Sequence, residues 1–150
     1  GAGVGKTFAL LLDPCRDLHN PKFNSVIFRR TMPQIKNPGG LWDESQDIFP
    51  IAGGVQKESA SRWDFPSGSS VKFSHLEYEK DVYAWQGSQL AYIGFDELTH
   101  FTEKQFFYLL SRNRSVCGIK PRIRSTCNPD PESWVRNFID WWIGKDGSPL

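Results

Sequence analysis

The chain has little cysteine, no long apolar run and almost no net charge. Its three cysteines, Cys15, Cys117 and Cys127, show no CxxC spacing, which argues against a zinc site or a disulfide framework and for a reducing compartment. No apolar run approaches the roughly 20 residues that span a bilayer, and no charged segment followed by an apolar stretch marks a secretion signal. With a formal net charge of +1, any contact with nucleic acid must come from local lysine and arginine residues.

The 150 residues have a composition typical of a globular protein and correspond to one domain, or most of one. We expect strands at 23–30, 90–95 and 122–127, and a β-hairpin within 61–76 around the turn Pro66-Ser67-Gly68-Ser69. We expect helices at 6–12, 103–112 and 133–143, and two short helices or a loop and a helix within 33–49. Strands that alternate with helices predict an α/β fold with a mainly parallel sheet, in which the hairpin is an insertion or an edge.

The first seven residues, GAGVGKT, match the end of the phosphate-binding (Walker A) pattern G-x-x-x-x-G-K-[ST], whose first glycine would lie one residue before Gly1. In such a loop Gly3 and Gly5 let backbone amides converge on phosphate oxygens. We therefore expect Gly1, Ala2, Gly3, Val4, Gly5, Lys6 and Thr7 to bind nucleotide. Lys6 would contact the β and γ phosphates, and the Thr7 hydroxyl would bind Mg²⁺. The alternative is a glycine turn that enters a helix.

A second motif, Asp96-Glu97, follows the apolar strand LAYIGF, as in a Walker B motif. We expect Asp96 to hold Mg²⁺ beside Thr7, directly or through water. Glu97, just past the strand, would orient and deprotonate the attacking water. The alternative is an acidic pair on the surface at the end of a strand.

A third strand ends in Thr126, Cys127 and Asn128, before Pro129. These small polar residues, Asn128 above all, would hydrogen-bond the attacking water or the γ-phosphate and report hydrolysis to the rest of the fold. The alternative is a simple transition from strand to turn.

Arg29 and Arg30 end another strand at the same edge of the sheet, where ligands bind in open α/β folds. They would contact phosphate or DNA, or else be solvated charges. The three histidines are separated and have no carboxylate or cysteine framework around them, so we expect none of them to bind metal.

Several stretches together resemble the ATPase domain of the large terminase subunit of tailed bacteriophages: GAGVGKT, VIFRRT with NPGGLWDES, GFDELTHFTEKQFFYLLSR and RSTCNPDPESWVRNFIDWWI. The resemblance implies a P-loop NTPase fold of the RecA and helicase type and the use of ATP and Mg²⁺ to translocate double-stranded DNA into a capsid. It also implies a ring of subunits, a portal protein and a small terminase subunit as partners, and a place in the host cytoplasm at the procapsid portal.

Members of that family are longer and carry a nuclease domain with clustered acids. We therefore expect residues 1–150 to be a fragment of the ATPase domain, with the strand that feeds Gly1 truncated and the nuclease activity confined to the full-length parent. The arginine that stabilises transition-state charge is left open among Arg62, Arg112, Arg114, Arg122 and Arg124.

Three other functions have the same or a related core. One is a helicase or translocase outside packaging, and another is a degenerate binding module without catalysis. The third is a kinase or nucleotide-dependent switch, but the chain has no N/T-K-x-D motif, which a switch GTPase would use to read the base.

Overall fold

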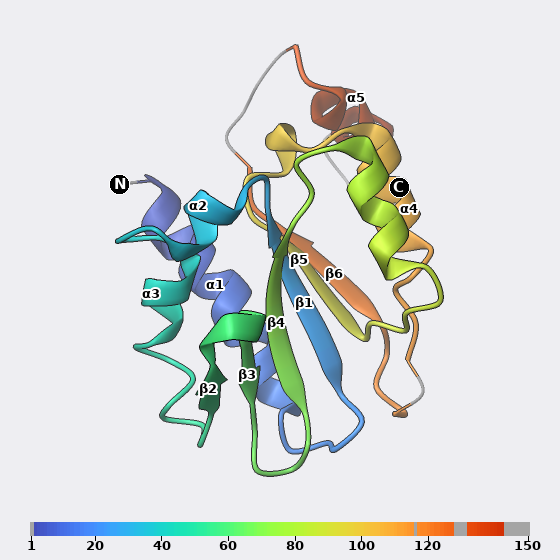
Figure 1. The fold of residues 1–150 in the computed structure, drawn as a ribbon. Coiled ribbons are helices and arrows are strands. Elements are labelled where there is room, and N and C mark those ends of the chain that lie inside the picture. Colours follow the sequence, from blue (N-terminus) through green and yellow to red (C-terminus); the bar gives the residue numbers. More distant parts are fainter. Residues whose placement is uncertain (1, 116, 128–131, 143–150) are drawn as a thin grey trace.

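A computed structural model describes residues 2–115, 117–127 and 132–142 (Figure 1). In these residues one six-stranded sheet has the order β2-β3-β4-β1-β5-β6. The strands are β1 (Asn24–Arg29), β2 (Val55–Lys57), β3 (Arg62–Asp64), β4 (Ser70–His75), β5 (Tyr92–Phe95) and β6 (Arg122–Ser125). The α-helices are α1 (Ala2–Leu12), α2 (Met32–Lys36), α3 (Leu41–Ser45), α4 (Glu103–Leu110) and α5 (Trp134–Trp142). Short 3₁₀ helices lie at Asp13–Asp17, Glu58–Ala60, Glu79–Trp85 and Leu98–His100.

The sheet is mainly parallel, as predicted. Strand β1 pairs in parallel with both β4 and β5, and β5 pairs in parallel with β6. The predicted hairpin is β3 and β4, which are antiparallel and lead to the edge strand β2. Strand β2 was not expected, because its three residues are all exposed and show no apolar alternation.

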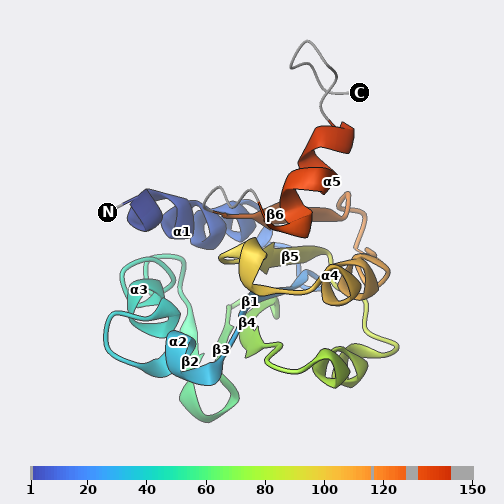
Figure 2. The ribbon, with the colours of Figure 1, turned by 90° about the horizontal axis from the view of Figure 1, so that it is seen from above.

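Helices cover both faces of the sheet (Figure 2). Seen from above, α1, α2 and α3 lie on one side of it, and α4 and the 3₁₀ helix Glu79–Trp85 lie on the other. Successive residues of β1 point to opposite faces, so Ile27 joins the core under α1 while Val26 and Phe28 join the core under α4. This burial on two faces explains why β5 is a continuous apolar run.

Local sequence signals position the helices as expected. Thr102 and Gln105 form the predicted capping box of α4, with the Thr102 amide 2.9 Å from Gln105 Oε1 and the Gln105 amide 3.2 Å from Thr102 Oγ1. Pro14 follows the end of α1 and opens the 3₁₀ helix Asp13–Asp17. Two short helices, α2 and α3, flank Asn37-Pro38-Gly39-Gly40.

The start of the first helix differs from the prediction. We expected a loop over the first residues and a helix from Lys6, but α1 begins at Ala2. A helix satisfies its own backbone amides through i→i−4 hydrogen bonds, whereas a phosphate cradle leaves amides free to face an anion. Residues 2–5 therefore have helical geometry here and do not form the predicted phosphate loop.

Among the described helices, none has both the length and the apolar composition needed to cross a bilayer. Residues 128–131 and 143–150 lie outside the described part, so the predicted role of Asn128 and the end of the last helix are not seen.

Candidate functional site

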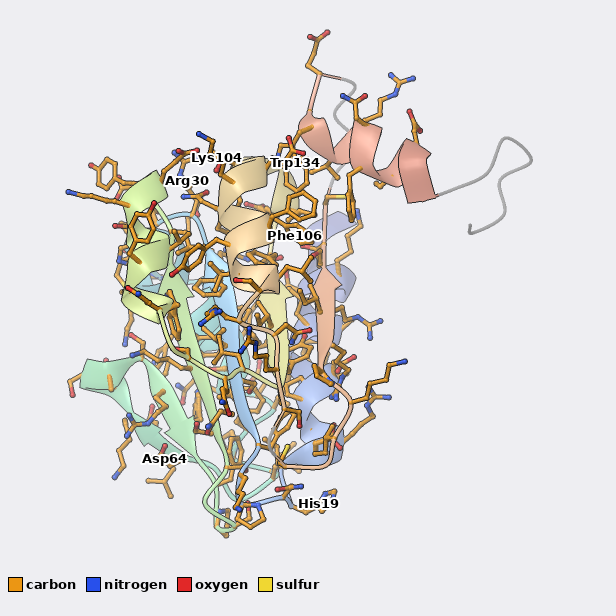
Figure 3. The ribbon with its side chains drawn as sticks, turned by 90° about the vertical axis from the view of Figure 1, so that its right-hand side faces the viewer. His19, Arg30, Asp64, Lys104, Phe106 and Trp134 are labelled. Carbon is orange, nitrogen blue, oxygen red and sulfur yellow. The ribbon has the colours of Figure 1, made fainter. Side chains whose placement is uncertain are left out.

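The start of α1 and the carboxyl ends of β1, β5 and β6 meet at one edge of the sheet, the upper edge in Figure 1. Because these strands are parallel, the residues that follow them lie together, as expected for a ligand-binding edge of an α/β fold. Figure 3 shows Arg30, which follows β1, at this end of the molecule, and His19 and Asp64 at the opposite end. The site described below is therefore remote from His19 and from the Arg62–Asp64 ion pair.

Asp96 is the centre of this edge. It directly follows β5, and only 2% of the residue is exposed. The Thr7 hydroxyl lies 3.2 Å from Oδ1 and 3.3 Å from Oδ2 of Asp96. The Thr126 hydroxyl donates to Oδ1 at 2.7 Å, and the Arg29 guanidinium pairs with Oδ2 at 2.5 Å. A buried carboxylate is tolerated only when it is paired in this way.

Lys6 connects the first motif to the third. Its ammonium group donates to the carbonyl oxygen of Cys127 at 3.0 Å. The Cys127 side chain packs against the apolar core under α4, so the carbonyl is the part of this residue that takes part in the site. The structure thus brings Lys6, Thr7, Asp96 and Thr126 together, as the sequence predicted.

Glu97 has a strained backbone. Its φ of 61° and ψ of 63° lie in the left-handed region, which residues other than glycine rarely occupy. Thr126 supports this conformation on three sides: its amide donates to the Phe95 carbonyl at 2.9 Å, its carbonyl accepts from the Leu98 amide at 2.7 Å, and its hydroxyl accepts from the Glu97 amide at 2.9 Å. The Asp96-Glu97 turn is therefore anchored to β6.

The Glu97 carboxylate contacts a different residue, His100. Its Oε2 lies 3.1 Å from Nδ1 of His100, and the two side chains are 40% and 46% exposed. Sequence analysis did not include His100 in the site. The spacing of three residues between Glu97 and His100, which lets the two side chains meet across one helical turn, is the signal that could have indicated it.

Neither arginine at the end of β1 is a merely solvated charge. Arg29 joins Asp96 to the Gln34 carbonyl of α2, which accepts from its Nη1 at 3.1 Å. Arg30 donates to the Glu77 carbonyl at 3.1 Å and to the His100 carbonyl at 2.6 Å. In this structure both contact protein groups rather than an open surface.

Glu44 on α3 is a second residue that the sequence did not indicate. Its Oε2 is buried and makes no hydrogen bond to the residues that the structure describes. Burial raises the pKa of this carboxyl group, the nearby Arg29 lowers it, and Asp96 raises it. Glu44 therefore lies within the electrostatic reach of the Arg29–Asp96 pair.

Besides Arg62, which pairs with Asp64, two more of the arginines left open by the sequence form ion pairs. Arg122 contacts Asp13 at 2.6 Å and Asp17 at 2.8 Å, and Arg124 contacts Asp13 at 2.8 Å. Although burial alone would raise it, the pKa of Asp13 is lowered by hydrogen bonds from Arg122 and Arg124. These pairs attach β6 to the 3₁₀ helix Asp13–Asp17, the end remote from Asp96.

Within the described residues, no group of three or more histidine, cysteine or acidic side chains is arranged to hold a metal ion. Two of the oxygen groups at this edge, the Thr7 hydroxyl and the Asp96 carboxylate, are adjacent to each other. Hydroxyl and carboxylate oxygens are the protein ligands that Mg²⁺ uses in nucleotide sites, together with phosphate and water. The two residues therefore offer the kind of ligand atoms that a magnesium ion uses, although Arg29 pairs with Oδ2 of Asp96 in this structure.

Comparison with protein families matches residues 1–149 to "Terminase large subunit, T4likevirus-type, N-terminal". Among solved structures, the large terminase of a thermophilic bacteriophage has a TM-score of 0.70 and 17% identity, over 92% of this chain and 34% of that chain. The same protein in complex with ADP has a TM-score of 0.60 and 16% identity, over 86% and 31%. An arginine-to-alanine mutant of the Thermus phage P74-26 large terminase ATPase domain has a TM-score of 0.60 and 16% identity, over 93% and 61%. None of the curated proteins matches the chain.

At these identities the likeness shows the fold: an α/β fold with a mainly parallel sheet flanked by helices, as expected from the sequence. The chain spans about a third of the length of the first two of these proteins.

Proposed function

Because this chain belongs to the family of N-terminal domains of terminase large subunits, we propose that it is the ATPase part of a viral DNA-packaging motor. In this proposal, ATP hydrolysis at the edge around Asp96 drives double-stranded DNA into a capsid. The observation that carries the proposal is the convergence of Lys6, Thr7 and Thr126 on Asp96 and its flanking strand end, from segments far apart in the sequence. A solved relative bound to ADP supports the choice of nucleotide.

Thr7 and Asp96 would hold the magnesium ion, since their oxygens are adjacent and Asp96 is buried. The ion, when bound, supplies charge that polarises the phosphate oxygens of the nucleotide. The other groups act on the nucleotide and on water. Lys6 directly precedes Thr7, which places its side chain beside the proposed metal site. When nucleotide binds, its ammonium group would exchange the Cys127 carbonyl for the β and γ phosphates.

Glu97 would accept the proton of the attacking water. Its half-exposed carboxylate is open to water, and its amide is anchored by Thr126, which fixes the point from which the side chain extends. The left-handed backbone of Glu97 ends the strand geometry of β5. We propose that Glu97 therefore acts on water while Asp96 binds the metal.

Thr126 would couple the chemistry to the fold. One hydroxyl group touches both the metal-binding and the water-activating residue, so a shift at either is transmitted to β6. Asn128, which lies outside the described residues, is proposed to extend this coupling to the γ-phosphate. For residues 1–7 to bind phosphate as a loop, residues 2–5 have to leave the helical geometry of α1.

The proposal extends to the rest of the motor. The family favours packaging over a helicase function elsewhere, with a portal protein, a small terminase subunit and a ring of large subunits at the procapsid in the host cytoplasm. We propose that residues 1–150 are one part of a longer large subunit, with a further strand before Gly1 and the nuclease activity in a separate domain.

The test is Glu97→Gln in the full-length large subunit, assayed for nucleotide binding, ATP hydrolysis and DNA packaging. The amide fills the same space but accepts no proton, so binding is expected to persist while hydrolysis and packaging are lost. The control is Glu79→Gln, which removes an exposed acid from the 3₁₀ helix Glu79–Trp85. Hydrolysis by Glu97→Gln at the rate of that control would refute the assignment.

A further inference from the structure

Arg29 occupies a position that conflicts with metal binding. Its guanidinium pairs with Oδ2 of Asp96, the residue proposed to hold Mg²⁺, and only 16% of the Arg29 side chain and 1% of the Asp96 side chain are exposed. The Thr126 hydroxyl donates to Oδ1, and the Thr7 hydroxyl lies 3.2 Å from Oδ1 and 3.3 Å from Oδ2. Both Asp96 oxygens are therefore already engaged, and a cation that binds Asp96 directly has to share an oxygen with one of these partners or displace it.

Arg29 is the partner whose movement is electrostatically favoured when a metal arrives. The threonine hydroxyls are neutral and can rotate to share an oxygen with a metal, but a guanidinium and a magnesium ion beside the same oxygen repel each other. An arginine displaced into a buried environment needs another anion, because an unpaired buried charge is costly.

Glu44 is placed to be that anion. Arg29 already contacts α2, since its Nη1 donates to the Gln34 carbonyl. Helix α3, which carries Glu44, packs against α2. Glu44 lies on α3, and its Oε2 is buried without a hydrogen-bond partner among the described residues. A buried carboxylate oxygen without a donor is free to accept a hydrogen bond from a guanidinium that moves toward it. Burial raises the pKa of Glu44, and the positive charge of Arg29 acts in the opposite direction.

We propose that Arg29 is an internal counterion that holds the place of Mg²⁺ on Asp96, and that it transfers to Glu44 when Mg²⁺ and nucleotide bind. Arg29 and Glu44 are then positioning residues of the nucleotide site, acting through Asp96. In the metal-free state the pair Arg29–Asp96 keeps the buried carboxylate neutralised. In the metal-bound state the pair Arg29–Glu44 ties α3 to the end of β1. This inference rests on the proposed function, because it assumes that Asp96 binds the metal.

The proposal predicts opposite effects for the two residues. Arg29→Gln removes the competitor for Asp96, so less Mg²⁺ should suffice to support nucleotide binding. Glu44→Gln removes the second acceptor, so Arg29 should stay on Asp96 and more Mg²⁺ should be needed. We expect the midpoint for Mg²⁺ to fall roughly tenfold in the first variant and to rise roughly tenfold in the second, the size typical of one charge-assisted contact. A purely structural role would shift both variants in the same direction.

The experiment uses the full-length large subunit and a fluorescent N-methylanthraniloyl derivative of ADP, titrated with MgCl₂, so that hydrolysis is not the readout. The charge-matched controls are Lys104→Gln, at the same end of the molecule as Arg30 (Figure 3), and Asp43→Asn, the exposed neighbour of Glu44 on α3. Arg29→Lys keeps the positive charge and should stay near the wild-type midpoint. Thermal unfolding provides a second measurement: Mg²⁺ with ADP should raise the Tm of Arg29→Gln more than that of wild type.

Opposite shifts beyond those of the two controls would support the exchange. Shifts of the same sign, or midpoints equal to the controls, would overturn it while leaving the proposed function in place if the wild type still needs Mg²⁺. Nucleotide binding by the wild type that does not respond to Mg²⁺ would overturn the proposed function and the exchange together.

Discussion

Replacing Thr126 with valine tests the connection between the fold and the chemistry. Valine has nearly the shape of threonine, so the change removes a hydroxyl group and leaves no cavity. That hydroxyl donates to the Asp96 carboxylate at 2.7 Å and accepts from the Glu97 amide at 2.9 Å. Both contacts are lost at once, whereas the backbone hydrogen bonds of Thr126 to Phe95 and Leu98 remain.

The expected loss of stability follows from those two contacts. A hydrogen bond to a charged group contributes about 1.5–3 kcal/mol, and one between neutral groups contributes about 0.5–1.5 kcal/mol. Because Thr126 is only partly buried, we expect the lower half of the combined range, about 2–3 kcal/mol. Without its anchor, the left-handed conformation of Glu97, which costs about 1–2 kcal/mol, should relax and move the carboxylate away from its working position.

The assays are thermal unfolding and steady-state ATP hydrolysis by the full-length large subunit. Thr126→Val should lower the Tm and reduce kcat at least tenfold with a smaller change in KM, because the general base is displaced more than the nucleotide. Thr126→Ser, which keeps the hydroxyl, is the matched control and should keep a Tm and a kcat close to those of the wild type. If valine and serine behaved alike, the hydroxyl would not be what positions Glu97.

Three further predictions use the same protein. Lys6→Ala should weaken nucleotide binding as well as hydrolysis, since the cation also contacts the phosphates of the bound ground state; an unchanged Kd would argue against the phosphate site. Asn128→Ala should reduce DNA packaging more than ATP hydrolysis, and equal losses would make Asn128 an ordinary catalytic residue. Asp13→Asn should lower stability at pH 7, because the pKa of Asp13 in the folded state lies below its ordinary value of 3.8. That stabilisation is fully present above pH 3.8 and is lost as the pH falls through the lower pKa of the folded state. The Tm values of the two proteins should therefore converge in strong acid. A difference in Tm that does not depend on pH would contradict the charge pairing.

The elements that the sequence predicted well are those with local signals. A continuous apolar run predicted β5, the pair Thr102 and Gln105 predicted the start of α4, and Asn37-Pro38-Gly39-Gly40 separated α2 from α3. Each of these signals acts within a few residues, through propensity, capping or burial on both faces. Strand β2 has no such signal, because it forms by pairing with β3 at an exposed edge. The early start of α1 was missed because glycine-rich residues adopt either helix or loop, depending on what their amides contact.

The residues of the candidate site were predictable where a local motif marks them. Lys6, Thr7, Asp96 and Thr126 were identified from motifs, because phosphate, metal and water chemistry requires particular side chains after particular elements. That they meet was also foreseeable, since parallel strands present their carboxyl ends at one edge.

By itself, then, the sequence determined which residue types follow each strand and in which order. Only the tertiary structure decided how they pair: that Arg29 faces Asp96 across adjacent strands, that Thr126 supports a left-handed Glu97, and that α3 brings a buried acid near both. Arg29 and Asp96 are 67 residues apart in the chain and become neighbours because β1 lies between β4 and β5 in the sheet. Strand order and helix packing depend on the burial of both faces of the whole sheet, a sum over many distant contacts that no short motif encodes.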